Sequence, residues 1–411
     1  MSMLKEKWGI QIDPGYLKPY LEMFAKELTI VGYTKLTMYE YMRSGAHFGY
    51  WLTHEGIVID QIDENVILAF EKHYCKCPFV PNREGVSRAY INRIRRIIKF
   101  LRSQGVVKPI IPQPVLENPI IIAFRNWLVN HRGLSDSTIK RVVRLIGILC
   151  ANLGYEPQNY SPENIRNVIF AYASHNARGQ TKCFVTAVRT FIKFLSSQGL
   201  VQSYLVSAIP TIPQWRLSSL PKYLPESDII RIIDSCDITT CLGVRDRAIL
   251  LLLSRLALRA GDIVSMRIQD IDWNRGVIKL TGKGRTECYL PLPQELGDAI
   301  LHYLESARPR VLINELFLCA RAPWRAFAGP SVVSSIVAAA IRRAEIKNPP
   351  SLGTNLLRHS AATNMLRNGL ELEAVSAILR HRSLDMTAYY AKVDVNMLQK
   401  IAQPWPGGFS C

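Results

Sequence analysis

The 411-residue sequence lacks the features that mark exported and membrane-spanning proteins. Its first residues, MSMLKEKWGI, contain no apolar stretch of the kind found in signal peptides. The longest apolar runs, such as Ala248 to Leu253, end well before the ~20 residues needed to cross a bilayer. The nine cysteines are scattered and odd in number, which favours reduced thiols. These absences predict a cytoplasmic protein that does not enter a membrane.

The sequence also lacks the motifs of metal- and nucleotide-dependent enzymes. It has no Walker A Gly-Lys-Ser/Thr, no HExxH, and no group of carboxylates suited to two magnesium ions. The cluster His73-Tyr-Cys75-Lys-Cys77 is faintly similar to a set of metal ligands, but a second downstream pair is missing. We interpret Cys75 and Cys77 as half-buried thiols at a helix end, and we predict no metal and no cofactor.

Acidic residues are few relative to basic ones. Asp and Glu total 33 and Lys and Arg total 51, which gives a net charge of +18 and a pI of about 9.6. Because 48% of the residues are hydrophobic and 20% charged, the chain has enough apolar material for folded cores. A folded chain with this charge suggests a polyanionic partner, with nucleic acid first and an acidic membrane surface second.

Two proline-rich stretches divide the chain into three blocks, because repeated proline removes amide donors and blocks helices. We predict an N-terminal helical domain over residues 1–108, a linker over 109–115, a second helical domain over 116–207, a linker over 208–225, a third domain over 226–403, and a tail over 404–411. The first two blocks look like copies of one unit. IRRIIKFLRSQGVV (94–107) aligns with VRTFIKFLSSQGLV (188–201), and each reads as an amphipathic helix closed by a Gly in the C-cap position.

The third block has a mixed pattern. We predict helices over 248–258, 261–268, 330–345, 355–367, 371–379 and 385–390, and two strands over 277–280 and 289–292. The strands would be joined by a turn at Gly282 to Gly284. The sequence therefore predicts a mainly α protein with a small antiparallel β-sheet in the third domain.

Basic residues and one tyrosine lie at ordered positions in this block. Arg259 follows the apolar helix, Lys283 sits at the hairpin tip, and Arg358, His381 and Tyr390 follow in order. The pattern resembles the tyrosine recombinases of the phage integrase and Xer type. That family has an Arg after an apolar helix, a hairpin Lys, His-x-x-Arg, a Gly-His pair, and a Tyr nine residues after that His. Here Arg259 precedes Lys283 by 24 residues, Arg358 precedes Tyr390 by 32, and His381 precedes Tyr390 by nine.

The resemblance implies an enzyme that breaks and rejoins DNA without metal. Tyr390 would attack phosphorus and form a 3′-phosphotyrosyl intermediate, so resealing would need no ATP. Arg259 and Arg358 would each direct two N–H groups at phosphate oxygens, and His381 would donate another hydrogen bond. Lys283 would protonate the leaving 5′ oxygen. Each residue has an ordinary structural explanation on its own, such as a helix-end Arg or a core Tyr, and only the shared order and spacing favour catalysis.

Neighbouring residues carry further expectations. Asp262 stands where the family usually has an acidic residue, and His359 follows the second Arg. We expect both to position the catalytic residues without contacting the phosphate themselves. Tyr389 competes with Tyr390 as the nucleophile, but adjacent helical residues point about 100° apart and the family spacing selects Tyr390.

Three positions depart from the family pattern. Asn355 replaces the first His of His-x-x-Arg, and an amide cannot shuttle a proton near neutral pH. We expect it to lower the cleavage rate without abolishing cleavage. Arg380 replaces the usual Gly before His381, and Arg382 follows it. We interpret both as extra phosphate contacts, with solvated charge as the alternative.

The second block resembles the family's core-binding domain, and the first resembles an extra copy of it. Candidate DNA contacts are Arg132, Lys140, Arg141, Arg144 and Arg285. The resemblance implies double-stranded DNA as partner and a homotetramer on two sites, with related recombinases of the same element as further partners, at the bacterial nucleoid. We expect the integrase or transposase of a mobile element acting through a Holliday junction. The alternatives are an Xer-like resolvase and a catalytically weak accessory partner of an active recombinase.

Overall fold

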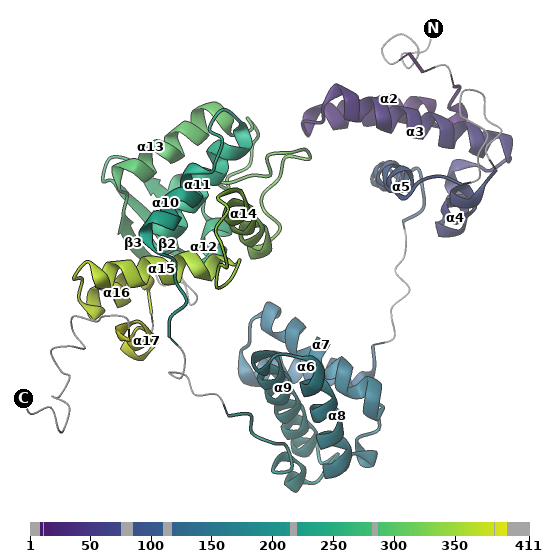
Figure 1. Ribbon diagram of the computed structural model, residues 1–411. Coiled ribbons are helices and arrows are strands. Elements are labelled where there is room, and N and C mark those ends of the chain that lie inside the picture. The colour runs from purple at the N-terminus through teal and green to yellow at the C-terminus, as the bar shows by residue number, and fades with distance from the viewer. Residues whose placement is uncertain are drawn as a thin grey trace, which may run out of the picture. The chain divides into compact units, whose positions relative to one another are not determined.

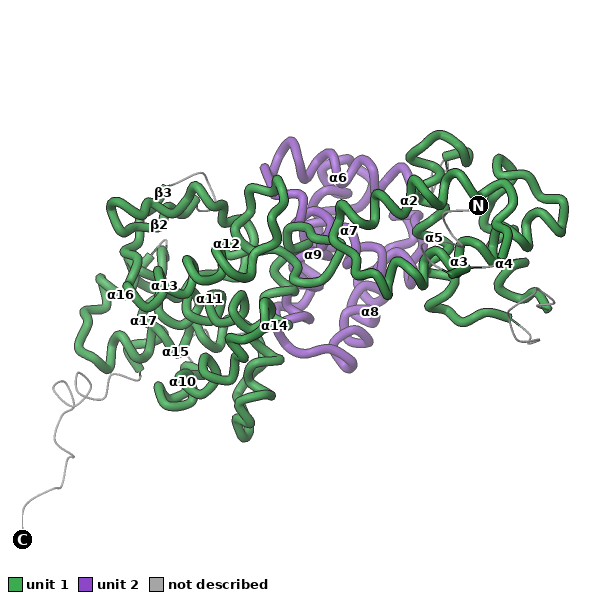
Figure 2. The backbone as a smooth tube through the Cα atoms, turned by 90° about the horizontal axis from the view of Figure 1, so that it is seen from above, with its two compact units in different colours: residues 1–109, 219–411 green, residues 110–218 purple. Residues whose placement is uncertain are grey.

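The computed structural model describes residues 9–10, 12–74, 85–109, 117–213, 220–281, 287–381 and 383–392. The chain divides into two compact units, residues 110–218 and residues 1–109 together with 219–411 (Figure 2). Buried apolar side chains form three large clusters, within residues 10–107, 121–212 and 224–357. Each proline-rich stretch contains one boundary between the units.

The N-terminal residues form four α-helices around the first cluster (Figure 1). The first turns of the last three are capped by polar side chains, because the first amides of a helix have no partner within it. Thr34, Asp63 and Ser87 each accept a hydrogen bond from the amide three residues further on. The helices are α2 (Lys18–Ile30), α3 (Lys35–His54), α4 (Glu64–Lys72) and α5 (Arg88–Ser103).

Residues 110–218 form a second four-helix arrangement. Asn118 and Ser161 cap its first and third helices through side-chain oxygens. Gly133, with φ of +53°, ends the first helix in the left-handed conformation that glycine adopts without strain. The helices are α6 (Pro119–Arg132), α7 (Asp136–Leu153), α8 (Pro162–His175) and α9 (Arg178–Ser197).

The two aligned sequence segments have the same ending in the structure. Helices α5 and α9 end at Ser103 and Ser197, and each serine hydroxyl donates to the carbonyl three residues back at 2.7 Å. The cap residues are glutamines, and the glycines lie one position further on, with φ of +72° and +70°. The glycine therefore terminates each helix from the position after the cap.

The remaining residues fold as helices around a small sheet, so the predicted mainly α fold with an antiparallel sheet is confirmed. The sheet has the order β1-β2-β3 and is antiparallel throughout, with Leu280 opposite Cys288. The strands are β1 (Ile271–Asp272), β2 (Val277–Thr281) and β3 (Glu287–Pro291). The helices are α10 (Glu226–Asp234), α11 (Cys241–Arg255), α12 (Ala260–Ser265), α13 (Gln294–His302), α14 (Pro330–Arg343), α15 (Thr354–Arg367), α16 (Leu372–Leu379) and α17 (Ala388–Ala391).

Several predicted boundaries are wrong for identifiable reasons. The apolar helix was expected to run to Leu258, but α11 ends at Arg255 and Ala257 adopts φ of +50°. The sequence predicts that Arg259 directly follows the apolar helix. In the structure a turn separates Arg259 from α11, and Arg259 is the residue directly before α12. The helix predicted over 385–390 is a 3₁₀ turn, Leu384–Met386, followed by the short α17. The sequence prediction also missed β1, α10 and α13.

Candidate active site

Arg358 is a buried cation on α15 with only neutral partners. Its side chain donates to the carbonyls of Ala257 and Leu379, the latter at 2.5 Å. The left-handed turn at Ala257 and the end of α16 at Leu379 supply these acceptors. Burial, followed by the neighbouring Arg259, lowers the pKa of Arg358 to about 10. The fold thus holds this positive charge where, in the described part of the chain, no carboxylate is hydrogen-bonded to it.

Arg259 lies beside Arg358, because both guanidinium groups donate to the Leu379 carbonyl. The Arg259 Nη2 is 3.3 Å from that oxygen and 3.2 Å from the Arg380 carbonyl. Its backbone N–H donates to Asp262 at 2.9 Å, which fixes Arg259 at the start of α12. Burial, then the charge of Arg380, lowers the pKa of Arg259. The two arginines therefore form a pair of adjacent cations.

Arg380 adds a third guanidinium to this pair. It ends α16 with φ of +52°, and its side chain is ion-paired to Asp262. The side chain is only 10% exposed, and its Nε and Nη1 have no hydrogen-bond partner among the described residues. Three guanidinium groups and one carboxylate leave a net positive charge, which suits an anionic ligand.

Tyr390 lies in the small apolar cluster that also holds Leu379 and Val375, and it is 2% exposed. Its hydroxyl oxygen is 2.7 Å from Nδ1 of His359. Burial raises the pKa of Tyr390 to about 12, against an opposing effect of Arg358. Tyr389 points elsewhere, because its hydroxyl donates to the Leu220 carbonyl at 2.8 Å. The two adjacent tyrosines are therefore engaged with different partners.

His381 stacks on the nucleophile candidate. Its ring is nearly parallel to that of Tyr390, with centroids 6.5 Å apart, and its Nδ1 is 2.8 Å from the Thr387 hydroxyl. Thr387 is fully buried and was missed by the sequence analysis, since nothing in its local sequence sets it apart. Asn355, at the start of the same helix as Arg358, is exposed.

The structure thus brings together Arg259, Arg358, Arg380, His381 and Tyr390, with Asp262 and His359 in contact with them. Lys283, Arg285 and Arg382 lie outside the described residues, as do Cys75 and Cys77. The flanking hairpin strands are described, and Lys279 on β2 is ion-paired to Glu287 at 2.6 Å. Within the described ranges no group of three His, Cys, Asp or Glu residues could hold a metal ion, and no helix could span a membrane.

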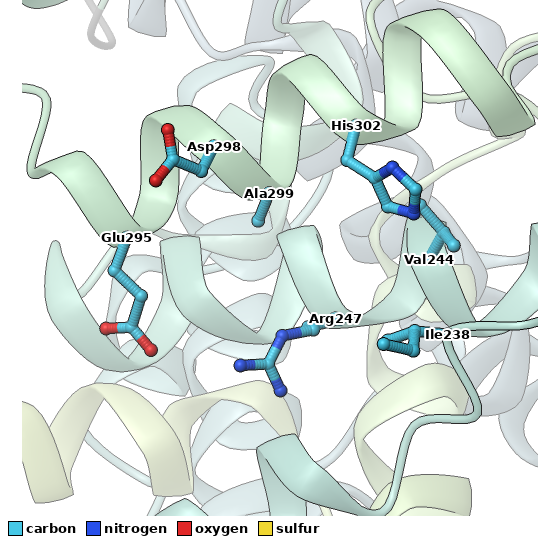
Figure 3. A pocket seen from close by; sticks show the side chains of 7 residues that line it. All are labelled: Ile238, Val244, Arg247, Glu295, Asp298, Ala299 and His302. Carbon is cyan, nitrogen blue, oxygen red and sulfur yellow. The ribbon is translucent and has the colours of Figure 1, made fainter.

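A separate pocket between α11 and α13 shares no residue with this cluster (Figure 3). It is lined by Ile238, Val244, Arg247, Glu295, Asp298, Ala299 and His302. This pocket therefore contains neither the three arginines nor Tyr390. Long duplexes are bound across surfaces, so the arginine cluster is the better guide to the site.

The site places a net positive charge beside Tyr390, which suits an anionic group such as a phosphodiester. The sequence model of the Phage integrase family matches residues 222–397. The protein y4rA of Sinorhizobium fredii, named as an integrase/recombinase, is 33% identical over 409 residues, covering 94% of each chain. Tyrosine recombinase XerD of Lacticaseibacillus casei is 27% identical and covers 66% of this chain and 92% of its own.

Solved structures share the fold. The XerH site-specific recombinase bound to a palindromic difH substrate, in a post-cleavage complex, has a TM-score of 0.55 at 17% identity, over 70% of this chain and 94% of that one. A lambda integrase (75–356) dimer bound to a COC′ core site has a TM-score of 0.53 at 14% identity, over 70% and 96%. The chain belongs to the phage integrase family of tyrosine recombinases. It is a site-specific DNA recombinase, an enzyme that cuts and rejoins DNA.

Proposed function

We propose that this chain cuts DNA through Tyr390 and without metal or ATP. The Tyr390 oxygen attacks the phosphorus, the bond from phosphorus to the 5′ oxygen breaks, and a 3′-phosphotyrosyl link forms. Because that link keeps the energy of the broken bond, a free 5′ hydroxyl from another strand can reverse the step. Two rounds of such exchange pass through a Holliday junction.

The arginine pair carries the proposal. Arg259 and Arg358 come from positions 99 residues apart in the chain, yet both donate to the same Leu379 carbonyl. A phosphate oxygen that takes the place of this carbonyl would receive hydrogen bonds from both guanidinium groups. Negative charge develops on the nonbridging oxygens as the phosphorus becomes five-coordinate, so fixed cations stabilise the transition state more than the ground state.

The other site residues would complete the reaction. His381 donates a hydrogen bond to a nonbridging oxygen, while Lys283 protonates the departing 5′ oxygen. Arg380, Arg382 and Arg285 contact phosphates near the cut, and Asn355 occupies the usual His position without a titratable group. The Asp262 carboxylate accepts a hydrogen bond from the backbone N–H of Arg259 and is ion-paired to the side chain of Arg380.

DNA contacts outside the site would come from the helical domains. Residues 116–207 are the core-binding domain, and residues 1–108 are an additional copy of it, with 109–115 and 208–225 as linkers, 226–403 as the catalytic domain and 404–411 as the tail. Arg132 at the end of α6 and Lys140, Arg141 and Arg144 on α7 are all exposed, as backbone-contacting residues must be. A lambda integrase tetramer bound to a Holliday junction shares the fold, with a TM-score of 0.50. It supports a homotetramer on two DNA sites.

The integrase or transposase of a bacterial mobile element is the favoured role, exercised at the nucleoid and alongside related recombinases of the same element. Its support is the length of the match, because y4rA aligns over 94% of this chain whereas XerD aligns over 66%. An Xer-like resolvase has less support, since the N-terminal block would then be unexplained. The exposed Asn355 is the one observation that favours an accessory partner.

The experiment is a covalent-capture assay. A nicked suicide substrate made from the DNA that flanks the gene's own element is mixed with the protein in EDTA, and an SDS-resistant protein–DNA band is sought. We expect the wild type and Tyr389→Phe to give the band and Tyr390→Phe to give none. A band from Tyr390→Phe would contradict the assignment of the nucleophile, and absence of any band despite tight DNA binding would favour the accessory role.

A further inference from the structure

His359 makes a direct hydrogen-bonding contact with the Tyr390 hydroxyl, so it can do more than position a neighbouring catalytic residue. The Nδ1 atom of His359 on α15 lies 2.7 Å from the hydroxyl oxygen of Tyr390 on α17. The ring centroids are 5.5 Å apart and the planes are tilted by 46°, so the edge of the imidazole faces the phenol. This nitrogen is at hydrogen-bonding distance from the atom that would attack phosphorus.

Cleavage needs an acceptor for the phenolic proton. With a pKa raised to about 12, only about one Tyr390 in 10⁵ is ionised at pH 7. A phenol with so little anion reacts well only if a base takes its proton during the attack.

The other groups that face Tyr390 in the described structure are unsuited to this task. Arg358 is a donor and has no acceptor. Tyr389 directs its hydroxyl to the Leu220 carbonyl. The Nδ1 of His381 already contacts the Thr387 hydroxyl at 2.8 Å, and its ring lies nearly parallel to that of Tyr390. Asn355 is exposed and has no titratable atom.

We propose that His359 is the general base that activates Tyr390, an assignment that rests on the proposed function. As the Tyr390 oxygen bonds to phosphorus, its O–H bond breaks and the proton moves to Nδ1 of His359. The bond from phosphorus to the 5′ oxygen breaks, and that oxygen takes a proton from Lys283. In resealing, the incoming 5′ hydroxyl attacks phosphorus and gives its proton to Lys283, while the departing Tyr390 oxygen regains its own from His359.

The surroundings keep His359 in the form that can accept. Burial, and then the charge of Arg358, lowers the pKa of His359, so the ring is neutral at pH 7. To act as the base it carries its proton on Nε2 and leaves Nδ1 to accept the proton of Tyr390. The titratable groups that face the ring are Arg358, Tyr389 and Tyr390. The imidazolium formed in the reaction is repelled by Arg358, and the growing negative charge on a bound phosphate offsets that repulsion. The base is therefore most effective when DNA is present.

The test is single-turnover cleavage of the suicide substrate in EDTA by His359→Asn. The Asn side chain places an oxygen near the position of Nδ1, so it can accept the hydrogen bond but cannot take the proton. We expect cleavage to slow about 10²–10⁴-fold, with DNA binding by gel shift unchanged. His302→Asn, an exposed histidine on α13, is the matched control and should cleave at the wild-type rate.

The pH dependence separates a base from a residue that only positions Tyr390. The wild-type rate should level off above the pKa of His359, whereas the His359→Asn rate should rise about tenfold per pH unit as Tyr390 ionises. A more acidic fluorotyrosine at position 390 should recover much of the lost rate. Asn355→His added to His359→Asn should not, because Nδ1 of residue 359 is the atom that lies 2.7 Å from the Tyr390 hydroxyl, whereas residue 355 is exposed.

The two proposals fail in different ways. A covalent band from Tyr390→Phe would overturn the proposed function. If that band is absent and His359→Asn cleaves at the wild-type rate with the wild-type pH profile, only the role of His359 is overturned. A slowed variant with an unchanged pH profile and no recovery by fluorotyrosine would also overturn it, and would assign His359 to positioning.

Discussion

Among the residues of the site, Arg380 combines an unusual backbone conformation with an unusual side-chain environment. Its φ of +52° is a value that glycine adopts freely and that strains other residues. Its side chain is ion-paired to Asp262 and leaves two nitrogens without a partner among the described residues. Arg380 thereby keeps the Asp262 carboxylate occupied, so that within the described residues the Arg259 guanidinium donates hydrogen bonds only to carbonyls.

Arg380→Gly tests this arrangement. The substitution relieves the backbone strain, which is worth about 1 kcal/mol, but frees Asp262 to pair with the Arg259 side chain. We expect cleavage to fall at least about tenfold, equivalent to ~1.4 kcal/mol, and we expect Asp262→Asn added to Arg380→Gly to restore part of the rate. Single-turnover cleavage measures both. An Arg380→Gly enzyme as fast as the wild type would show that Asp262 does not compete for Arg259.

At the scale of helices and strands, the ends of the elements position the chemistry. Ala257 turns out of α11, Arg259 directly precedes α12, Leu379 ends α16, and Tyr390 lies in the single turn of α17. Helix ends leave carbonyls without partners inside the helix, and here those of Leu379 and Arg380 receive Arg259 and Arg358. The rigid interiors of α11 and α15 hold these ends in place through buried apolar contacts.

Two glycine-to-alanine substitutions within residues 110–218 should change the free energy of unfolding in opposite directions. Gly199 follows α9 with φ of +70°, whereas Gly147 lies inside α7 without a positive φ, and a Cβ at either position would meet no atom within 4 Å. Gly199→Ala should therefore destabilise by about 1 kcal/mol, and Gly147→Ala should stabilise by about 0.5–1 kcal/mol. Urea unfolding followed by circular dichroism provides both values. If both substitutions change the free energy of unfolding in the same direction, backbone conformation does not determine their effect on stability.

The order of the chemical residues could be predicted from the sequence, whereas their contacts could not. Arg259, Arg358, His381 and Tyr390 follow a spacing that is visible in one chain. The turn at Ala257 breaks a run of apolar residues that favours helix throughout, so the run alone places the helix end wrongly. The hydrogen bond between His359 and Tyr390 depends on how α17 packs on α15, which local sequence does not encode.

For the whole molecule, charge is the dominant property. A net charge of +18 provides a long-range attraction for DNA that does not depend on base sequence. Each phosphate neutralised by a lysine or arginine releases condensed counterions, so affinity falls steeply as salt rises. Exposed residues of α7 contribute to this release of counterions only if they contact the duplex.

Lys140→Ala should reduce the salt dependence of DNA binding. If Lys140 contacts one phosphate, the slope of log K against log salt becomes shallower by about 0.9, and affinity falls on every duplex alike. Gel shifts at several salt concentrations measure the slope, and Arg166→Ala, an equally exposed residue on α8, is the control. An unchanged slope for Lys140→Ala would remove this face of α7 from the DNA interface.

The Leu379 carbonyl has a consequence for inhibition. This carbonyl already accepts hydrogen bonds from Arg259 and Arg358. An incoming anion must therefore displace the Leu379 carbonyl, which is part of the same chain and is always present beside the two arginines. Free inorganic phosphate, which has no other hold on the protein, should therefore be a poor inhibitor. A phosphodiester within a duplex is held by many contacts along its length and can make the exchange. The recombinase would thus ignore the small anions of the cell and respond to phosphate only when it is part of DNA.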